Sequence, residues 1–400
     1  FNTKLKQTCA TNGHLNAFDA FFASTYPCED LPKVLKNFDI KDIEMEGQDV
    51  WIATDRGLIT MSQNECDYTL YTKSNSILPD NEVNRVVIGT SGKIYVGTSE
   101  GLVIIDGTSW TFLGANQIGL SNNNLNISAL AVDEKETVWI GTRTGELGKY
   151  ENGSWTIFDG QNSPLGHYGI LDVAVSRAGN IWMGTDGGGI VGYVNGAWTD
   201  FNHNHGHHGG GNYVRTYAFA PPYLRSSVVQ SITFDLNGMM WIGTTEGFVY
   251  WTGGQSIAYH SRNIGIPNDD VRDIYFDKND AIWIATAYGA VRYNGYGWTH
   301  YHTGNSDLPS NSTNVIISDP LNHIWVGTSS GAHAINYKII AKFHLPEAVC
   351  LDQTLKVDNE TVGATNYRWV VDGQDAGEDE GLDWTFVTPG VHDIVLYAYN

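Results

Sequence analysis

Trp283-Ile-Ala-Thr-Ala-Tyr-Gly289 is one of seven variants of a single phrase in this chain of 400 residues. Each variant has an aromatic residue, an aliphatic residue or Met, then Gly or Ala, then Thr, and closes on Gly. The other six begin at Trp51, Tyr95, Trp139, Trp182, Trp241 and Trp325. The spacing is about 42–44 residues, except that the fourth and fifth phrases lie about 16 residues further apart. A period of this length is typical of one four-stranded sheet in a repeating all-β architecture.

The best-preserved unit shows how the repeat folds. Strand-like stretches at Val271–Phe276, Ile282–Thr286, Ala290–Tyr293 and Trp298–Tyr301 alternate with turn signals and predict an antiparallel meander. The turn residue Asp277 recurs as Asp133, Asp235 and Asp319, so we interpret these aspartates as turn residues and not as catalysts. Seven such units predict a seven-bladed β-propeller, with the six Trp residues of the phrases in its core and a close backbone approach at the Gly or Ala two residues later.

The linkers between the units make the resemblance specific. They read Asn75-Ser-Ile-Leu-Pro79, Asn263-Ile-Gly-Ile-Pro267 and Asn305-Ser-Asp-Leu-Pro309. Together with the aspartate turn and the Trp-Ile-Gly-Thr phrase, they resemble the two-component-regulator-type propeller repeat over about residues 38–343. That resemblance implies a propeller of the kind found in periplasmic sensors of hybrid histidine kinases and in secreted bacterial surface proteins. It does not imply an enzyme.

The last part of the chain has a different pattern. Thr365-Asn-Tyr-Arg-Trp-Val-Val-Asp-Gly373 and Thr385-Phe-Val-Thr-Pro-Gly390 resemble a polycystic-kidney-disease-type (PKD-type) Ig-like β-sandwich, with His392 where that family usually has Tyr. The predicted organisation is an N-terminal extension (1–37), the propeller (38–343, with an insertion at 202–227) and the sandwich (344–400). We expect Lys338–Phe343 to be the fourth strand of the seventh blade, and further modules to follow in a longer multidomain protein.

Composition excludes several classes of partner. The chain carries 44 acidic and 23 basic residues, a net charge of −21, which disfavours nucleic acid and anionic membrane surfaces. No apolar run reaches the roughly 18 residues needed to cross a bilayer, so we expect no membrane insertion in this segment. A start at Phe1 fits a mature exported protein or an excised fragment. Among the four cysteines, Cys9 with Cys28 is the preferred disulfide, and buried free thiols are the alternative.

Loops that follow the second strand of each unit and loops between units should emerge on the same rim of a propeller. The candidate ligand-binding residues on this rim are Arg56, Glu100, Arg143, Asp186, Glu246 and Tyr288, with Tyr213 and Tyr217 from the insertion. Unconstrained surface loops are the alternative interpretation.

Two segments could hold metal ions. The insertion contains His203, His205, His207 and His208, whose imidazoles suit a transition metal, although a hydrated loop is the alternative. The acidic stretch from Asp372 to Glu380 could offer carboxylates to calcium, against a simple solvated loop. No other cofactor is indicated.

The sequence contains no nucleophile elbow, no HExxH motif and no phosphate-binding Gly loop. It therefore favours a non-enzymatic recognition or adhesion module, at the cell surface or secreted, that binds a glycan or protein partner through the propeller rim. One alternative is the extracytoplasmic oligosaccharide-sensing domain of a hybrid two-component system. Another is a polysaccharide lyase or hydrolase that uses the propeller channel.

Overall fold

The computed structural model describes residues 3–8, 35–47, 49–62, 68–120, 125–200, 224–278, 280–295, 297–319, 323–335, 343, 345, 349, 351–359, 366–389 and 391–399. The chain divides into two compact units. The larger unit comprises Pro27–Pro320 and Ile324–Ile335, and the smaller comprises Phe1–Tyr26, Leu321–His323 and Asn336–Asn400. The prediction of an all-β protein is confirmed, since the helices described are the single turns α2 (Ala115–Ile118) and α3 (Ser261–Ile264). None of these described helices could cross a membrane.

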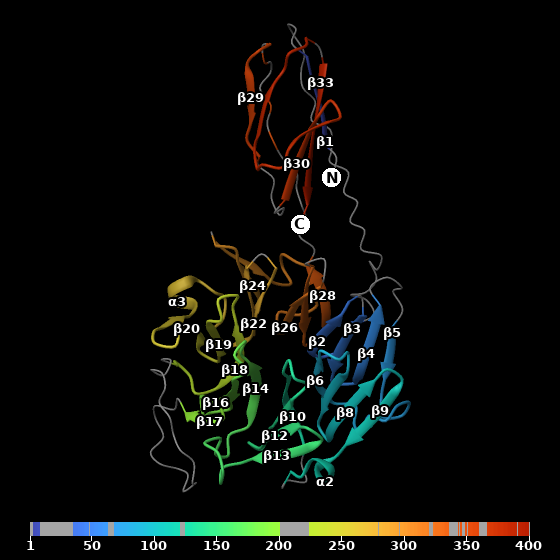
Figure 1. Cartoon of the computed structure of the whole chain (residues 1–400), viewed down its shortest axis with the longest axis vertical. Helices are drawn as coiled ribbons and strands as arrows, with labels where there is room; N and C mark the ends of the chain where they lie inside the picture. Colours follow the sequence, from blue (N-terminus) through green and yellow to red (C-terminus); the bar gives the residue numbers. More distant parts are fainter. Residues whose placement is uncertain are drawn as a thin grey trace. The chain divides into compact units, whose positions relative to one another are not determined.

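The larger unit consists of consecutive antiparallel meanders arranged around a centre (Figure 1). Among the described residues of this unit, six sheets have four strands and one has three. The first strands, nearest the centre, are β2 (Ile40–Glu46), β6 (Val83–Ile88), β10 (Ile127–Val132), β14 (Ile170–Val175), β18 (Val229–Phe234), β22 (Val271–Phe276) and β26 (Thr313–Ser318).

The remaining strands of each sheet follow outward. The second strands, which carry the repeated phrase, are β3 (Asp49–Thr54), β7 (Ile94–Thr98), β11 (Val138–Thr142), β15 (Ile181–Thr185), β19 (Met240–Thr244), β23 (Ile282–Thr286) and β27 (Ile324–Thr328). The third are β4 (Gly57–Ser62), β8 (Gly101–Asp106), β12 (Leu147–Glu151), β16 (Ile190–Val194), β20 (Gly247–Trp251), β24 (Gly289–Tyr293) and β28 (Gly331–Ile335). The fourth are β5 (Tyr68–Tyr71), β9 (Ser109–Leu113), β13 (Ser154–Phe158), β17 (Ala197–Asp200), β21 (Ser256–Tyr259) and β25 (Trp298–Tyr301).

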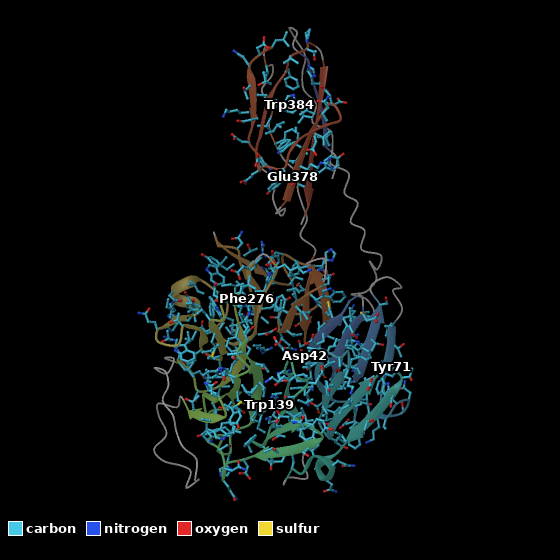
Figure 2. All side chains as sticks on the ribbon, in the orientation of Figure 1. Asp42, Tyr71, Trp139, Phe276, Glu378 and Trp384 are labelled. Atoms are coloured by element: carbon cyan, nitrogen blue, oxygen red, sulfur yellow. The ribbon has the colours of Figure 1, made fainter. Side chains whose placement is uncertain are left out.

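Hydrophobic cores lie between neighbouring sheets. One core joins Trp139 of β11 to Met183 of β15, and Trp139 is among the side chains labelled in Figure 2. Of the six phrase tryptophans predicted to be core, Trp51 and Trp241 are only half-buried. The predicted close approach is confirmed, because a Cβ added to Gly141 would lie 2.5 Å from Cγ2 of Ile170 in the next sheet.

The same kind of close glycine contact joins the last sheet of the larger unit to the first. A Cβ on Gly327 of the last sheet would lie 2.6 Å from Cγ2 of Ile40 in the first. The Asn314 side-chain amide donates to the Ile40 carbonyl (2.8 Å) and to Asp39 Oδ1 (3.0 Å). These contacts join β26 and β27 to β2 across about 270 residues of sequence, so the sheets form a closed cycle.

The aspartates between first and second strands form turns, as predicted, and two of them also bind a tryptophan side chain. Asp277 Oδ1 accepts from the Ala281 amide (3.0 Å), while Oδ2 accepts from the indole of Trp283 (3.0 Å). Asp235 and Trp241 repeat this pair at 3.1 Å. Asp277 and Asp235 therefore also hold the first aromatic residue of their phrases in place.

The smaller unit has two sheets around a core that includes Trp369 and Leu396. One sheet has the order β1 (Thr3–Thr8), β33 (Val391–Tyr399), β30 (Asn366–Val371) and β31 (Gln374–Gly377), and the other pairs β29 (Thr354–Val357) with β32 (Leu382–Thr385). The pairing of β1 with β33 unites the two ends of the chain, which the sequence pattern did not predict.

Two sequence-based predictions concern residues near this unit. Most of the expected seventh-blade strand Lys338–Phe343 lies outside the described residues, and Phe343 itself packs against Trp369 in the small unit, with ring centroids 5.1 Å apart. That part of the prediction is wrong, because this large apolar side chain is buried in a different core. Cys9, Cys28, Cys66 and Cys350 are outside the described residues, so the disulfide stays a prediction.

Candidate functional site

Two sets of loops meet at one rim of the larger unit, as the sequence predicted. In six of the seven ring sheets described, a backbone amide in the turn after the second strand donates to the carbonyl of the residue that precedes the first strand. Examples are the Ser99 amide to the Glu82 carbonyl (3.1 Å), and the corresponding bonds of Arg143 to Asn126 (3.1 Å) and Asp186 to Gly169 (2.8 Å). Because backbone bonds fix these turns, side chains on them keep a defined position at the rim.

The Thr of the repeated phrase fixes each turn from inside. Its buried hydroxyl donates to a carbonyl three or four residues later and, in most sheets, accepts an amide hydrogen two residues later. Thr286, for example, donates to Gly289 O (2.7 Å) and accepts from the Tyr288 amide (3.1 Å). All seven of these threonines are buried: Thr54, Thr98, Thr142, Thr185, Thr244, Thr286 and Thr328. The phrase therefore encodes a rigid rim as well as a core.

A β-bulge near the start of every first strand points one side chain toward the centre. In β2, Ile40 pairs with Thr54 and Asp42 with Ala53, so Lys41 is the extra residue. Bulges re-aim side chains and recur beside functional sites. The seven bulge residues are Lys41, Asn84, Ser128, Leu171, Gln230, Arg272 and Asn314.

These bulge residues line a cavity of about 410 Å³ at the mouth of the central channel. The other lining residues are Glu82, Arg85, Asn126, Arg143, Asp186 and Val228. The volume is within the range of small-molecule sites, but the lining is far more polar than usual. The cavity therefore suits a ligand rich in hydrogen-bonding groups.

The bulge side chains form a directional chain of hydrogen bonds around the mouth. Lys41 Nζ binds Glu82 (2.6 Å) and Asn84 (3.1 Å). The Asn84 amide donates to the Ile127 carbonyl (3.0 Å), and Ser128 donates to the Ile170 carbonyl (2.5 Å). In each case the donor belongs to one sheet and the acceptor to the next.

The series of side-chain hydrogen bonds continues on the other side of the ring. Gln230 donates to Asp270 (2.5 Å), Arg272 donates to Ser312 (2.7 Å), and Asn314 donates to the first sheet. A lining whose polar atoms are held in this way is preorganised for binding.

The series of side-chain hydrogen bonds is interrupted once, between β14 and β18, because the bulge residue there is Leu171, which has no polar side chain. Here the Leu171 carbonyl is bonded from across the channel, and backbone bonds join the two sheets at this seam. Arg85 reaches across the channel and donates to the Leu171 carbonyl (3.1 Å). The turn that carries Asp186 extends to the next sheet, where the amides of Gly187 (3.2 Å) and Gly189 (2.8 Å) donate to the Ser227 carbonyl. The seam is therefore held by backbone bonds that bring Asp186 to the cavity.

Three aspartates lie deeper in the channel than the bulge residues. Asp42, Asp172 and Asp273 accept amide hydrogens from the next first strand: Val86 (3.0 Å), Ile232 (2.7 Å) and Ile316 (2.8 Å). Asp42 is labelled near the centre of the ring in Figure 2.

Their environment disfavours negative charge. Burial raises the pKa of Asp42 to about 6 against the opposing effect of Arg85. Burial, and to a lesser extent the charges of the other two aspartates, raise the pKa of Asp273 to about 7. Burial also raises the pKa of Asp172. These three carboxyls cap the inner edges of the first strands. With pKa values of about 6 and about 7, Asp42 and Asp273 take up protons close to neutral pH.

The candidate rim residues divide into three groups. Arg143 and Asp186 line the cavity. Arg56, Glu100, Glu246 and Tyr288 lie on equivalent turns but do not line it; Arg56 is 3.5 Å from Asp55, and the Tyr288 side chain is 54% exposed. Tyr213 and Tyr217 are outside the described residues.

The metal-site candidates receive no support from the described geometry. His203, His205, His207 and His208 lie outside the described residues. Across the part of the chain that is described, no three His, Cys, Asp or Glu side chains are grouped as metal ligands. In the acidic stretch, Asp372 binds His392 (2.6 Å) and Asp375 binds Arg368 (3.0 Å). The first contact raises the pKa of His392 through hydrogen bonding and the charge of Asp372.

Sequence analysis missed most of the cavity lining, including the bulge residues. A signal was present: the second residue of the first strand is polar in six of the seven units, and in five of these six it directly follows an aliphatic residue. Strand patterning alone does not show which residue of such a stretch is left unpaired.

The pattern of the two-component regulator propeller matches residues 265–288. Among solved structures, a domain described as the extracellular domain of hybrid two component system BT3049 from B. thetaiotaomicron has a TM-score of 0.60 at 18% identity, over 92% of this chain and 54% of that chain. This chain thus spans about half of that domain.

Other solved structures are also similar. Catalytically inactive virginiamycin B lyase from Staphylococcus aureus, solved with quinupristin, gives a TM-score of 0.58 at 13% identity over 74% of this chain and 94% of that one. The WD40 propeller domain of Doa1 gives 0.53 at 13%, over 74% and 92%. No curated protein matches the sequence. At these identities the similarities show the fold, which is built of β-propeller repeats.

Proposed function

We propose that this chain is an extracellular recognition domain in which a seven-bladed propeller, joined to a PKD-type Ig-like sandwich, binds a hydroxyl-rich ligand at the mouth of its central channel. The observation that carries the proposal is the preorganised polar cavity of about 410 Å³. Its amides, carboxylates and guanidinium groups are the donors and acceptors that sugar hydroxyls require. An oligosaccharide is therefore the ligand class we expect.

Within this proposal, a sensory role is preferred to adhesion. The fold similarity to an extracellular domain of a hybrid two-component system supports that preference. A concave cavity also suits a small soluble ligand better than the broad contact area of an adhesion surface. In a sensor, ligand binding would change the equilibrium of a longer protein, and the propeller would need no catalytic activity.

The proposal is tested by titrating the full chain with a panel of soluble oligosaccharides, using calorimetry for binding and reducing-end release for cleavage. Binding without cleavage, weakened about tenfold or more by Asp186→Asn, is the expected result. Arg56→Gln is the matched control, because this rim residue does not line the cavity. Release of reducing ends would favour an enzyme. Binding only to immobilised polymer or protein, unaffected by Asp186→Asn, would favour adhesion and overturn the proposal.

A further inference from the structure

The cavity has the opposite charge balance to the chain as a whole. The complete sequence has 44 acidic and 23 basic residues. The charged residues that line the cavity are four cations (Lys41, Arg85, Arg143 and Arg272) and two anions (Glu82 and Asp186). In a strongly acidic protein, this local excess of basic groups marks the cavity as a place where negative charge is tolerated.

Three of the four cations already have partners. Lys41 pairs with Glu82 (2.6 Å), and Arg272 pairs with Asp270 (3.3 Å). Arg85 donates to the Leu171 carbonyl and lies close enough to Asp42 and Asp172 to oppose the rise in their pKa. These groups shape the cavity, but their charges are largely matched by the protein itself.

Arg143 is different. Its side chain is exposed and lines the cavity, yet it makes no hydrogen bond or ion pair with any residue that the structure describes. Its backbone is fixed by the bond to the Asn126 carbonyl (3.1 Å). A guanidinium on a rigid turn, without a partner of its own, can bind the two oxygens of a carboxylate at little cost in ordering.

Asp186 occupies the corresponding turn of the next sheet. Gly187 and Gly188 of this turn pack against the ring of Tyr168, and the Asp186 amide is bonded to Gly169. Within the described residues, its carboxylate has no partner and forms no ion pair with Arg143. The two opposite charges are therefore held apart on neighbouring rigid turns, where one ligand can contact both.

We propose that Arg143 makes the cavity selective for an acidic sugar, with the ligand's carboxylate on the Arg143 guanidinium and its hydroxyls on Asp186 and the bulge amides. This inference rests on the proposed function and specifies its ligand class. A neutral sugar would leave the guanidinium with weaker hydroxyl contacts. An amino sugar would place a second positive charge near Arg143.

The test compares a hexuronic acid oligomer with the uncharged hexose oligomer of the same linkage and length, by calorimetric titration of the full chain. We expect the acidic oligomer to bind more tightly, and its affinity to fall with added salt. Arg143→Gln should weaken the acidic oligomer about tenfold or more and change the neutral one by less than about threefold. Arg143→Lys should restore part of the loss because it keeps the charge, and Arg56→Gln should change neither affinity.

The possible failures are distinguishable. Equal affinity for both oligomers, or an equal loss for both in Arg143→Gln, would overturn the acidic selectivity. If Asp186→Asn still weakened a neutral oligomer, the proposed function would survive that failure. If neither oligomer bound, and Asp186→Asn changed no titration across the wider panel, both proposals would be wrong. Circular dichroism of each variant checks that the sheets are intact.

Discussion

Replacing Asp273 with Asn should remove a large part of the pH dependence of the larger unit's stability. Asp273 accepts amide hydrogens from Ile274 (2.9 Å) and Ile316 (2.8 Å), and burial raises its pKa from 3.8 to about 7. The folded protein therefore holds this proton to a higher pH than the unfolded chain does. The resulting stabilisation is complete below about pH 4 and is lost as the pH rises toward about 7.

The magnitude follows from the two pKa values. A difference of about three between folded and unfolded states corresponds to about 4 kcal/mol of unfolding free energy, as an upper limit. Asn cannot ionise but loses one acceptor oxygen, which costs about 1 kcal/mol at every pH. Asp273→Asn should therefore be slightly less stable than the wild type at about pH 4, and more stable by up to about 3 kcal/mol at about pH 8.

The assay is urea unfolding of the full chain from about pH 4 to about pH 8, followed by tryptophan fluorescence, with the variant compared to the wild type at each pH. The control is Asp106→Asn, which removes an exposed carboxylate 3.4 Å from Lys93. Parallel stability profiles for the wild type and Asp273→Asn would refute the reasoning, because they would show that this carboxyl titrates equally in both states.

Three further substitutions test the repeat, each by chemical unfolding against the wild type. Thr286→Val removes the buried hydroxyl bonded to Gly289 O and should destabilise by about 1–3 kcal/mol; an unchanged midpoint would show that the turn does not need it. Gly141→Ala forces a Cβ toward Ile170 and should cost about 1–3 kcal/mol, whereas a neutral effect would mean that the sheets can separate freely. Asn314→Ala breaks the side-chain bonds that join the last sheet to the first and should cost about 1–3 kcal/mol; no loss would show that packing alone closes the ring.

Much of the fold could be predicted from local sequence. The phrase at Trp283–Gly289 predicted a second strand and a tight turn, and both are present. The close contact that the phrase predicted with the next sheet is shown at Gly141 of the third phrase. Local signals were sufficient because alternation, turn residues and glycines act within a few residues. Two of the six described rim candidates, Arg143 and Asp186, also line the cavity.

The sequence by itself thus determined the repeat, its strands and the rim on which ligand-binding side chains could lie. Only the tertiary structure decided which residues face the channel, because the position of each bulge depends on pairing with the second strand. Closure of the ring brings Arg85 to Leu171, and Asp42 and Asp172 close enough to influence the pKa of Asp273. The pairing of β1 with β33 likewise joins opposite ends of the chain. Such contacts depend on the three-dimensional path of the chain, and short-range patterns carry no information about that path.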